Sequence, residues 1–512
     1  MAVDVLIGQA YFLRFDPTLW EAQRPYAPLG ALYAAAFARE AGHRVALFDA
    51  MLAESEADWD SALDQHRPAV AVLFEDSFNY LSKMCLLRMR TAAMRMIAAA
   101  RDRGIPVVVA GSDATDHPDM YLEQGAAAVI AGEGEVTLVQ LLEALRRGVD
   151  LASLDGVVVR RDEGLVRTPP RPIMRQLDAA PRPAWDLVDV ERYRAIWMRR
   201  HGYFSMNIAT TRGCPYHCNW CAKPIYGQRY TARSAEGVAE EIAWLKATYA
   251  PQHLWVTDDI FGLKPGWIEA FAAGLVARES VLPFKCLMRA DNVSRDVVAA
   301  LRTAGCRTVW IGAESGSQRI LDAMEKGTRV EQIETAARLL HEAGIEVCFF
   351  LQFGYPGETF ADIELTLDMV RRCRPDDIGI SVSYPLPGTP FHARVREQLG
   401  TKQNWVDSSD LAVMYRASHA PEFYRELHAF VHARFRLDRG VAAARSALRS
   451  PHRVSRAQLA SVAGALAPVL RLPALSRRVR QLARVQPALP PTPALLPLLT
   501  PQAAALPTEQ RH

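Results

Sequence analysis

The chain has 512 residues, with 50% hydrophobic and 23% charged residues and a formal net charge of +3. This length exceeds what one hydrophobic core ordinarily holds and predicts two or three domains. The composition is that of a globular protein, and the near-neutral charge excludes a chain-wide nucleic-acid footprint.

The N-terminal region, residues 1–150, alternates short apolar runs with segments of helical period. Near-continuous apolar strands between helices predict an α/β fold with a parallel sheet covered on both faces, in the doubly wound, flavodoxin-like order. We expect strands at Val3–Gln9, Val45–Asp49, Val70–Glu75, Val107–Gly111 and Val129–Ala131, and helices at Leu29–Ala41, Ala57–His66, Leu81–Arg103 and Val136–Arg147.

Ligands of such a sheet bind beyond the carboxyl ends of the strands. The loops that follow the expected strands are rich in small and polar residues. Their glycines either let a large flat ligand lie against the backbone or merely turn the chain. The residues in question are Gln9, Glu75, Asp76, Ser77, Gly111, Ser112, Asp113, Gly132, Glu133 and Gly134.

Residues 151–200 have the character of a connector. Val157–Arg161 and Leu165–Thr168 flank an Asp-Glu-Gly turn, which is a hairpin signal. Five prolines between residues 169 and 183 predict extended chain. We therefore place a domain boundary here.

Strand–helix alternation resumes in residues 201–395. Six βα units in succession predict a partial (β/α)6 barrel, with functional residues at the carboxyl ends of its strands. We expect strands at Ser205–Thr210, His253–Val256, Phe284–Met288, Thr308–Ala313, Val347–Leu351 and Ile378–Ser383, and helices at Glu236–Tyr249, Pro265–Ala277, Arg295–Thr303, Gln318–Met324, Val330–Ala343 and Thr359–Cys373.

Residues 396–486 are expected to be a helical extension, with one helix at Pro421–Arg436. Between Arg434 and Arg484 there are twelve arginines and a single acid, Asp438. Such a stretch fits either a solvated helical surface or peripheral contact with an anionic membrane. The Pro-, Ala- and Leu-rich residues 487–512 predict a disordered tail.

Eight cysteines do not form a disulfide framework, which is typical of a reducing cytoplasm. The N-terminus has an early acid and no basic segment, unlike a signal peptide. No stretch reaches the roughly 18 uninterrupted apolar residues of a spanning helix. We expect a soluble, cytoplasmic protein in which the five scattered cysteines are buried apolar residues, namely Cys85, Cys286, Cys306, Cys348 and Cys373.

The other three cysteines, Cys214, Cys218 and Cys221, are spaced C-x3-C-x2-C after the first expected barrel strand. A structural zinc site takes four protein ligands, so a zinc knuckle would need His217 in a crowded position. An iron–sulfur cube held by three thiolates instead leaves one iron open to a non-protein ligand. The loop is therefore the first candidate for chemistry.

This loop resembles that of the radical S-adenosylmethionine (radical SAM) superfamily. The resemblance implies that the three thiolates bind a [4Fe–4S] cluster, that SAM chelates the fourth iron, and that Trp220 lies near the adenine. A low-potential cluster beside a sulfonium can deliver one electron and break a C–S bond.

Two later strand ends are similar to places where this family contacts SAM. After the second barrel strand, Asp258 or Asp259 would meet the SAM amino group, although the family's frequent Gly-Gly-Glu is absent here. After the third strand, Arg289 would pair with the SAM carboxylate in a bidentate fork, or else form a surface ion pair.

Three further segments resemble signatures of the same family. Gly-Ala-Glu-Ser-Gly, with Glu314 and Ser315, would approach the ribose and the methionyl group. Gly-Tyr-Pro-Gly-Glu-Thr, with Gly354 and Gly357, would pass close to the adenine. Tyr384-Pro385-Leu386-Pro387-Gly388-Thr389-Pro390 is another recurring signature. Each alone is weak, and their order after the cysteines makes the set strong.

The N-terminal region is similar to the cobalamin-binding domain that precedes this barrel in B12-dependent radical SAM proteins. The similarity lies in Pro28–Gly30 with Glu40–His43, in Val109–Thr115 and in Gly132–Glu135. The Asp-x-His-x-x-Gly motif that gives cobalt a histidine is absent, since Asp64-Gln65-His66 ends a helix. We expect cobalamin without a histidine ligand, held by the loop residues named above. The resemblances cover residues 3–395.

The resemblance implies that SAM is cleaved to a 5′-deoxyadenosyl radical. This radical takes hydrogen from an unreactive C–H bond of a biosynthetic intermediate. A methyl group carried on cobalamin then joins the resulting carbon radical. C-methyl transfer is the first hypothesis. The alternatives are B12-linked oxidative cyclisation or rearrangement, and a non-catalytic corrinoid or Fe–S sensor. Methylthiotransferase chemistry is disfavoured because that family has an additional N-terminal cysteine trio. Expected partners are a small-molecule, lipid, glycan or peptide intermediate and an electron donor such as flavodoxin or ferredoxin.

Overall fold

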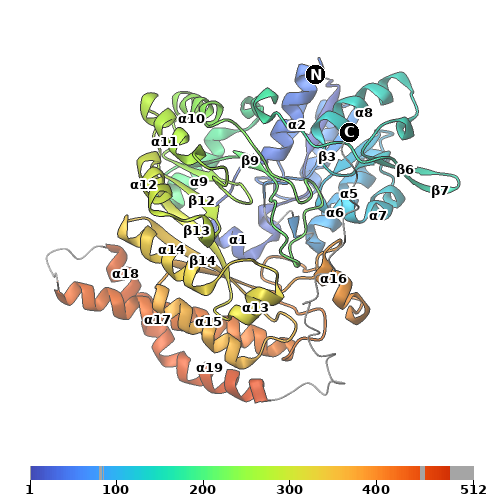
Figure 1. Cartoon of the computed structure of the whole chain (residues 1–512). Helices are drawn as coiled ribbons and strands as arrows, with labels where there is room; N and C mark the ends of the chain where they lie inside the picture. The colour runs from blue at the N-terminus through green and yellow to red at the C-terminus, as the bar shows by residue number, and fades with distance from the viewer. Residues whose placement is uncertain (1, 80–82, 85, 450–455, 485–512) are drawn as a thin grey trace, which may run out of the picture. The chain divides into compact units, whose positions relative to one another are not determined.

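The structure, a computed structural model, describes residues 2–79, 83–84, 86–449 and 456–484 (Figure 1). The chain divides into two compact units, residues 1–353 with 361–416, and residues 354–360 with 417–512. Each unit is described by itself. The tail expected at residues 487–512 lies outside the described residues.

The N-terminal sheet has the expected doubly wound order. Its strands run β2-β1-β3-β4-β5-β6-β7, and β1 to β5 are parallel. The order of the first five is therefore 2-1-3-4-5, the flavodoxin-like arrangement. The strands are β1 (Val5–Gly8), β2 (Val45–Phe48), β3 (Val70–Phe74), β4 (Val107–Ala110), β5 (Ala128–Ile130), β6 (Val157–Arg161) and β7 (Gly164–Arg167).

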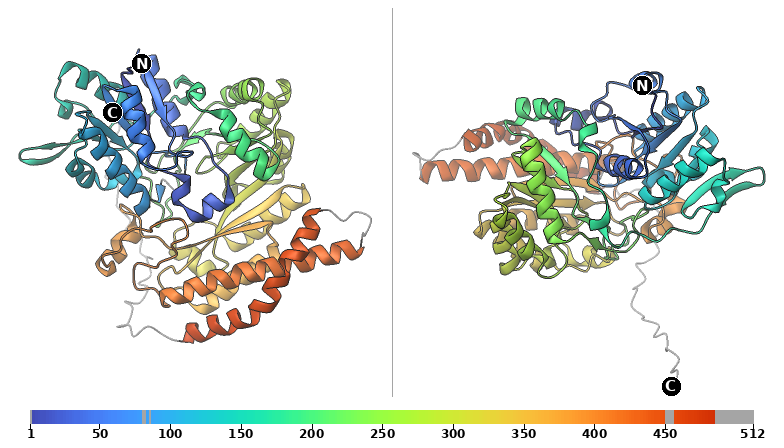
Figure 2. Two further views of the ribbon diagram at one scale, coloured as in Figure 1. Left: turned by 180° about the vertical axis from the view of Figure 1, so that it is seen from behind. Right: turned by 90° about the horizontal axis from the view of Figure 1, so that it is seen from above.

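Helices cover both faces of this sheet, as Figures 1 and 2 show. One apolar core joins the strands to α3, α5 and α7, and the other joins them to α2 and α8. This explains why the strands read as continuous apolar runs. The helices are α1 (Pro17–Ala22), α2 (Leu29–Glu40), α3 (Ala57–His66), α5 (Leu87–Arg101), α6 (Ser112–Asp116), α7 (Pro118–Gln124), α8 (Glu135–Arg147) and α9 (Val190–His201).

Some elements differ from the sequence expectation. The hairpin β6–β7 is not a free connector: β6 pairs antiparallel with β5 and extends the sheet. The helix expected at Leu81–Arg103 begins at Leu87 within the described residues, and residues 81, 82 and 85 lie outside them. The helices α1, α6, α7 and α9 were not expected. Three of them have seven residues or fewer, too few for helical periodicity to show.

The second sheet is the expected partial barrel. Its six strands are all parallel, in the order β15-β14-β13-β12-β11-β8. The strands are β8 (Ser205–Ile208), β11 (His253–Val256), β12 (Phe284–Met288), β13 (Cys306–Glu314), β14 (Glu346–Phe353) and β15 (Asp377–Val382), with a separate hairpin of β9 (Thr211–Arg212) and β10 (Thr231–Ala232).

Helices cover only one face of this second sheet. On that face the strand residues are almost fully buried, whereas the residues that alternate with them are partly exposed. The helices are α10 (Ala235–Tyr249), α11 (Trp267–Ala277), α12 (Arg295–Ala304), α13 (Gln318–Ala323), α14 (Val330–Glu342), α15 (Phe360–Cys373) and α16 (Pro390–Val395). Short 3-10 turns occupy Leu13–Phe15, Leu151–Ser153, Leu177–Ala179, Trp185–Leu187, Ala290–Asn292 and Arg396–Gln398.

The inner face of the partial barrel carries aromatic side chains. The pairing register aligns Trp255 with Lys285 and Lys285 with Thr308, and Trp310 follows Thr308 on the same side. The Trp310 ring stacks on Phe350 at 4.5 Å between centroids, and Phe350 is 38% exposed although it lies inside a strand. This face is therefore an apolar wall with one lysine.

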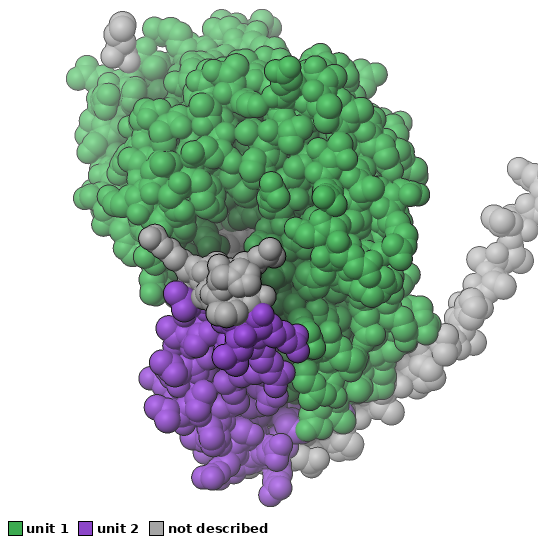
Figure 3. All heavy atoms as spheres, turned by 90° about the vertical axis from the view of Figure 1, so that its left-hand side faces the viewer, with its two compact units in different colours: residues 1–353, 361–416 green, residues 354–360, 417–512 purple. Residues whose placement is uncertain are grey.

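The second unit (purple in Figure 3) is helical. Its helices are α17 (Pro421–Arg449), α18 (Arg456–Gly464) and α19 (Leu466–Arg484), so the helix expected at Pro421–Arg436 continues for three more turns. Both α18 and α19 pack along α17. A Cβ on Gly440 would lie 2.3 Å from the Cβ of Ala465, so glycine permits this close approach.

Within the described residues, one helical stretch, Gln458–Arg484, is long and apolar enough to cross a membrane by length and composition alone. Arg471 and four further arginines lie within it, so no run of 18 uninterrupted apolar residues occurs there. Its apolar side chains Leu466 and Leu470 are 67% and 82% exposed.

Candidate active site

The cysteine loop is closed at its base by the antiparallel hairpin of β9 and β10. Gly213, which precedes the first cysteine, has φ +76°, and a Cβ there would lie 2.4 Å from the Arg229 carbonyl oxygen. Only glycine fits this position without moving the backbone. The local sequence thus folds residues 213–230 into a loop that returns to its starting strand.

The three thiols of this loop lie within electrostatic range of one another. Cys218 is buried and the other two are half-buried. The pKa of Cys221 is raised to about 12, chiefly by burial; Lys223 lowers it, and the charges of Asp259, Cys218 and Cys214 contribute to the rise. Burial likewise raises the pKa of Cys214. These thiols ionise when a cation compensates the cost of burial, as metal coordination does.

Among the described residues, no three His, Cys, Asp or Glu side chains are grouped to hold a single metal ion. Cluster ligands differ from such a group, because each thiolate of a [4Fe–4S] cube binds a different iron. The Arg289 guanidinium lies 3.9 Å from the Cys218 sulfur, and Lys223 lies near the other two sulfurs. Three thiols with adjacent cations fit an anionic cluster.

Asn219 fixes the position of the loop. Its backbone N–H donates to the Met324 carbonyl at 3.0 Å, and its side-chain amide donates to the Ala323 carbonyl at 2.8 Å. The neighbouring Trp220 is half-buried, and its indole N–H has no hydrogen-bond partner within the described residues. A donor without a partner is available to a ligand.

Asp258 and Asp259 point to different surroundings. The Asp258 carboxylate is buried, accepts hydrogen bonds from the Thr210 and Thr211 backbone at 2.7 and 3.0 Å, and thereby joins the ends of β8 and β11. Asp259 forms an ion pair with Lys83 of the N-terminal domain and lies near the cysteine sulfurs. Of the two, Asp259 faces the cysteine loop.

Arg289 is not a surface ion pair. It is buried and forms a bidentate pair with Asp291, at 3.0 and 2.9 Å, and its third nitrogen donates to the Lys326 carbonyl at 2.8 Å. Its guanidinium also stacks on Tyr216, 3.6 Å from the ring centroid. The fork expected to meet the SAM carboxylate is therefore occupied by a carboxylate of the chain itself.

Glu314 and Ser315 diverge at the end of β13. Glu314 has φ +58° and forms a buried ion pair with Lys326 at 2.9 Å. The Ser315 hydroxyl lies 3.2 Å from the hydroxyl of Thr366 on α15, among the covering helices. Gly354 and Gly357, both with φ +81°, belong to the second unit, where a Cβ on Gly354 would lie 3.2 Å from the Tyr424 ring. The roles of all four residues toward SAM stay predictions.

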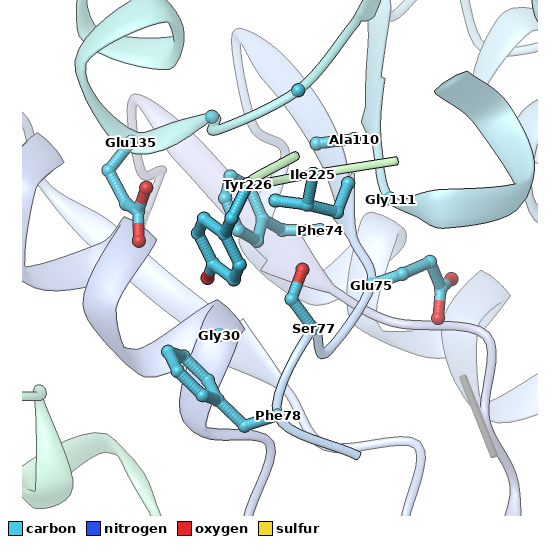
Figure 4. A pocket seen from close by; sticks show the side chains of 12 residues that line it. Gly30, Phe74, Glu75, Ser77, Phe78, Ala110, Gly111, Glu135, Ile225 and Tyr226 are labelled. Carbon is cyan, nitrogen blue, oxygen red and sulfur yellow. The ribbon is translucent and has the colours of Figure 1, made fainter. Parts of the chain in front are cut away.

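A cradle lies beyond the carboxyl ends of β3, β4 and β5. Its lining includes Glu75, Ser77, Gly111, Gly132 and Gly134 of the expected cobalamin residues. Figure 4 shows Ile225 and Tyr226, which follow the cysteine loop, among Phe74, Ser77 and Glu135. Gly132 would place a Cβ 3.5 Å from the Ile225 carbonyl oxygen. The strand ends of the N-terminal domain thus contact the cysteine-loop segment of the partial barrel, and both belong to the first unit.

Two buried polar side chains at the strand ends have atoms that a corrin with amide side chains could satisfy. Gln9 follows β1 and does not itself line the cradle. It is fully buried, and neither its Nε2 nor its Oε1 has a partner among the described residues. Glu75 accepts from the Ala10 backbone N–H at 2.7 Å, and its Oε2 has no partner there either. Unpaired buried amides are rare unless a ligand or water meets them. These residues fit cobalamin in the absence of a histidine.

The free volume in this cradle is about 10 Å³, room for one water molecule. Glycines let the backbone approach closely at two places in this cradle. A Cβ on Gly111 would lie 2.6 Å from the Glu75 Cβ, and one on Gly134 would lie 2.9 Å from the Phe74 ring. A corrin ring would therefore displace Ile225 and Tyr226, the side chains contributed by the cysteine-loop segment.

Besides Gln9, four of the residues expected to bind cobalamin have other partners or lie outside the cradle. Asp76 accepts from the backbone N–H groups of Gly30 and Phe78 at 3.1 and 3.0 Å. Asp113 forms a buried ion pair with Arg90. Glu133 pairs with Arg212, and Ser112 is buried at the start of α6 without lining the cradle.

Sequence reasoning missed Arg212. This guanidinium is buried between Glu133 and Glu135, with an oxygen of Glu135 at 2.7 Å, and it faces the Tyr226 ring. It joins the cysteine-loop strand to the N-terminal domain. The only signal in the sequence was an arginine directly before Gly213, which does not indicate partners some 80 residues away.

Glu75 should make the stability of the cobalamin-free protein depend on pH. Burial raises its pKa from 4.5 to about 8. The unfolded chain loses this proton near pH 4.5 and the folded chain keeps it to about pH 8, so stability falls as the pH rises between these values. In Glu75→Gln, the melting temperature should fall less over this interval. Parallel curves for variant and wild type in calorimetry would refute the assignment.

Comparison with known proteins agrees with this geometry. The radical SAM superfamily model matches residues 208–370, and the B12-binding domain model matches residues 19–142. An uncharacterized methyltransferase of Pyrococcus horikoshii is 26% identical over 77% of this chain and 83% of its own length. Hopanoid C-3 methylase of Methylococcus capsulatus is 28% identical over 82% of this chain and 79% of its own length.

Among solved structures, the radical SAM methyltransferase TsrM of Kitasatospora setae, with cobalamin and a [4Fe–4S] cluster bound, superposes with a TM-score of 0.64. It is 22% identical and covers 78% of this chain and 75% of that one, a likeness of fold. The chain therefore combines an N-terminal B12-binding domain with a radical SAM domain. Its two domains are those of an enzyme that uses a [4Fe–4S] cluster with SAM and cobalamin.

Proposed function

We propose that this enzyme transfers a methyl group to a carbon of a small-molecule substrate. The observation that carries the proposal is the meeting of the cobalamin cradle with the segment that directly follows the cysteine loop, where Ile225 and Tyr226 line the cradle. When bound, the cluster supplies an electron to SAM and cobalamin supplies a methyl group. One substrate can reach both only if the two sites adjoin.

The residues of the chain have separable tasks in this proposal. Cys214, Cys218 and Cys221 hold three irons, and Asn219 holds their loop in place. Asp259 receives the SAM ammonium group. Gln9 and Glu75 hold amide side chains of the corrin, and Tyr226 covers the cradle against water until the corrin enters.

The inner face of the barrel supports a substrate with an apolar or flat part. Phe350 and Trp310 form a stacked pair there, and exposed aromatic faces stack on flat ligands. Lys285 lies between the rings of Tyr26 and Trp255, at 5.3 and 4.9 Å, and has no carboxylate within ion-pair distance among the described residues. Burial lowers its pKa to about 8, so it is mostly charged at neutral pH and suits an anionic group.

The test is a search for the transferred methyl group. The protein is reconstituted without oxygen with iron, sulfide and hydroxocobalamin, reduced, and given a metabolite extract and SAM labelled with deuterium on its methyl group. We expect a labelled product that carries one additional methyl group, and none with Cys218→Ala. A product formed by ring closure with loss of hydrogen, or no product and no 5′-deoxyadenosine, would refute methyl transfer. The relatives that span most of the chain do not favour either alternative.

Peripheral membrane contact through the basic C-terminal region is also proposed. It is supported by the exposed leucines of α19 beside its arginines, because an apolar face flanked by cations suits an anionic bilayer. Flotation with neutral and anionic vesicles tests it, and equal recovery from both would refute it.

A further inference from the structure

A second cleft opens next to the cysteine loop. It has a volume of about 610 Å³ and is lined by residues of three chain segments, namely Ile173 and Arg175 of the connector, Arg229 to Ala232 of the loop and β10, and Leu263 and Lys264 after β11. The Leu263 backbone N–H donates a hydrogen bond to the Tyr230 hydroxyl at 3.3 Å, which joins the segment after β11 to the segment of the loop and β10. No step proposed above uses this cleft.

The cleft adjoins the first cysteine. Arg229, on its wall, has its carbonyl oxygen against Gly213, the residue before Cys214. Tyr230, also on the wall, lies close enough to Cys214 for the two charges to interact. Part of the wall of the cleft therefore belongs to the loop that holds the cysteines.

The charge of the cleft is of one sign. Arg175, Arg229 and Lys264 are all exposed, and none of them forms an ion pair with a carboxylate in the described part of the chain. No acidic residue lines the cleft. The chain as a whole has 60 basic and 57 acidic residues, so a cleft lined by three cations and no acid departs from its average charge. Such a surface attracts an anionic partner and speeds its encounter.

The arrangement fits a protein surface better than a small anion. The three cations come from separate segments and extend into solvent from the rim, whereas a phosphate or carboxylate site converges buried donors on one group. Ile173 and Leu263 supply apolar area between the charges, as at the centre of a protein interface.

We propose that Arg175, Arg229 and Lys264 form the docking surface for an acidic one-electron carrier protein of the flavodoxin or ferredoxin class. In the step served, the reduced carrier loses one electron and the cluster gains it, with no bond made or broken. Arg229 belongs both to this surface and to the loop that holds the cysteines, so the carrier would dock beside that loop. This inference rests on the cluster and not on the identity of the substrate.

The test compares two reductants on the reconstituted protein. The triple variant Arg175→Gln, Arg229→Gln, Lys264→Gln should bind a reduced, acidic flavodoxin at least about tenfold more weakly and lose most of the salt dependence of that binding, as expected when steering charges are removed. Reduction of its cluster by flavodoxin should slow by a similar factor. Reduction by methyl viologen, a small cation, should be unchanged.

A charge-matched control is the triple variant Arg199→Gln, Arg200→Gln, Arg307→Gln, whose residues are exposed and lie outside the cleft. It should bind flavodoxin like the wild type. Equal weakening in both variants, or unchanged binding in the cleft variant, would overturn the proposal. If flavodoxin binding is unchanged but the cleft variant loses affinity for inorganic phosphate or citrate, the cleft is a small-anion site and the proposal is wrong. Reduction by methyl viologen reports separately whether the cluster itself is intact.

Discussion

Replacing Cys218 with alanine should remove the cluster and all SAM cleavage. Three thiolates hold three irons of a cube, and the loop has no fourth cysteine to substitute. Cys218 is the buried member of the trio, 3.9 Å from the Arg289 guanidinium. After anoxic reconstitution, we expect the visible absorbance of the cluster to be lost and 5′-deoxyadenosine to fall below detection.

The matched control is Cys373→Ala. Cys373 is also a buried free cysteine, at the end of α15, outside the loop. Truncating either side chain removes a single buried atom, so both variants should fold, with a stability loss of about 1 kcal/mol. The iron content of Cys373→Ala should equal that of the wild type. A Cys218→Ala protein that retains its cluster absorbance, or a Cys373→Ala protein that loses it, would remove the basis for the site.

The second large effect is expected from Gln9→Leu. Gln9 lies directly after β1 with both polar atoms of its amide buried and unpaired among the described residues. A buried amide without partners costs about 1–3 kcal/mol, so leucine, of similar size, should leave the cobalamin-free protein as stable as before or more so. The same change should weaken hydroxocobalamin binding about tenfold or more, because a ligand amide then meets an apolar surface.

In Gln9→Leu, the stability of the cobalamin-free protein and its affinity for cobalamin therefore change in opposite directions only if the Gln9 amide binds cobalamin. The control Gln124→Leu removes an amide of the same domain that already donates to the Met94 carbonyl at 3.0 Å. It should lower the melting temperature and leave cobalamin affinity unchanged. Cobalamin titration by absorbance and thermal melts of both variants supply the two readouts. Wild-type affinity in Gln9→Leu would show that the amide is not part of the site.

The sequence predicts the two sheets well because their strands are buried on one or both faces. Strand β3 is an apolar run that is buried throughout, and strand β12 alternates buried with partly buried residues. The bounds of such strands follow from these patterns. The pattern does not reveal pairing partners. The hairpin β6–β7 was therefore recognised as a hairpin but placed in a connector, whereas β6 adds to the edge of the first sheet beside β5.

The candidate site could be predicted where function depends on local spacing, as for the three cysteines. It could not be predicted for acidic loop residues, because a carboxylate there can either meet a ligand or accept hydrogen bonds from neighbouring backbone. Asp76 and Asp258 both follow strands and both turn out to accept hydrogen bonds from neighbouring backbone. Composition at a strand end does not distinguish a carboxylate that meets a ligand from one that ties two loops together. Arg212 was missed for a related reason, since its two glutamate partners lie in another domain.

The most direct measurement is electron paramagnetic resonance of the reduced, anoxically reconstituted protein with and without SAM. The assignment of SAM needs an iron to which the polypeptide contributes no side chain. We predict that adding SAM changes the spectrum of the cluster, because the cosubstrate becomes a ligand of that iron. A signal that is identical in both samples, or a mononuclear metal with four protein ligands, would contradict it.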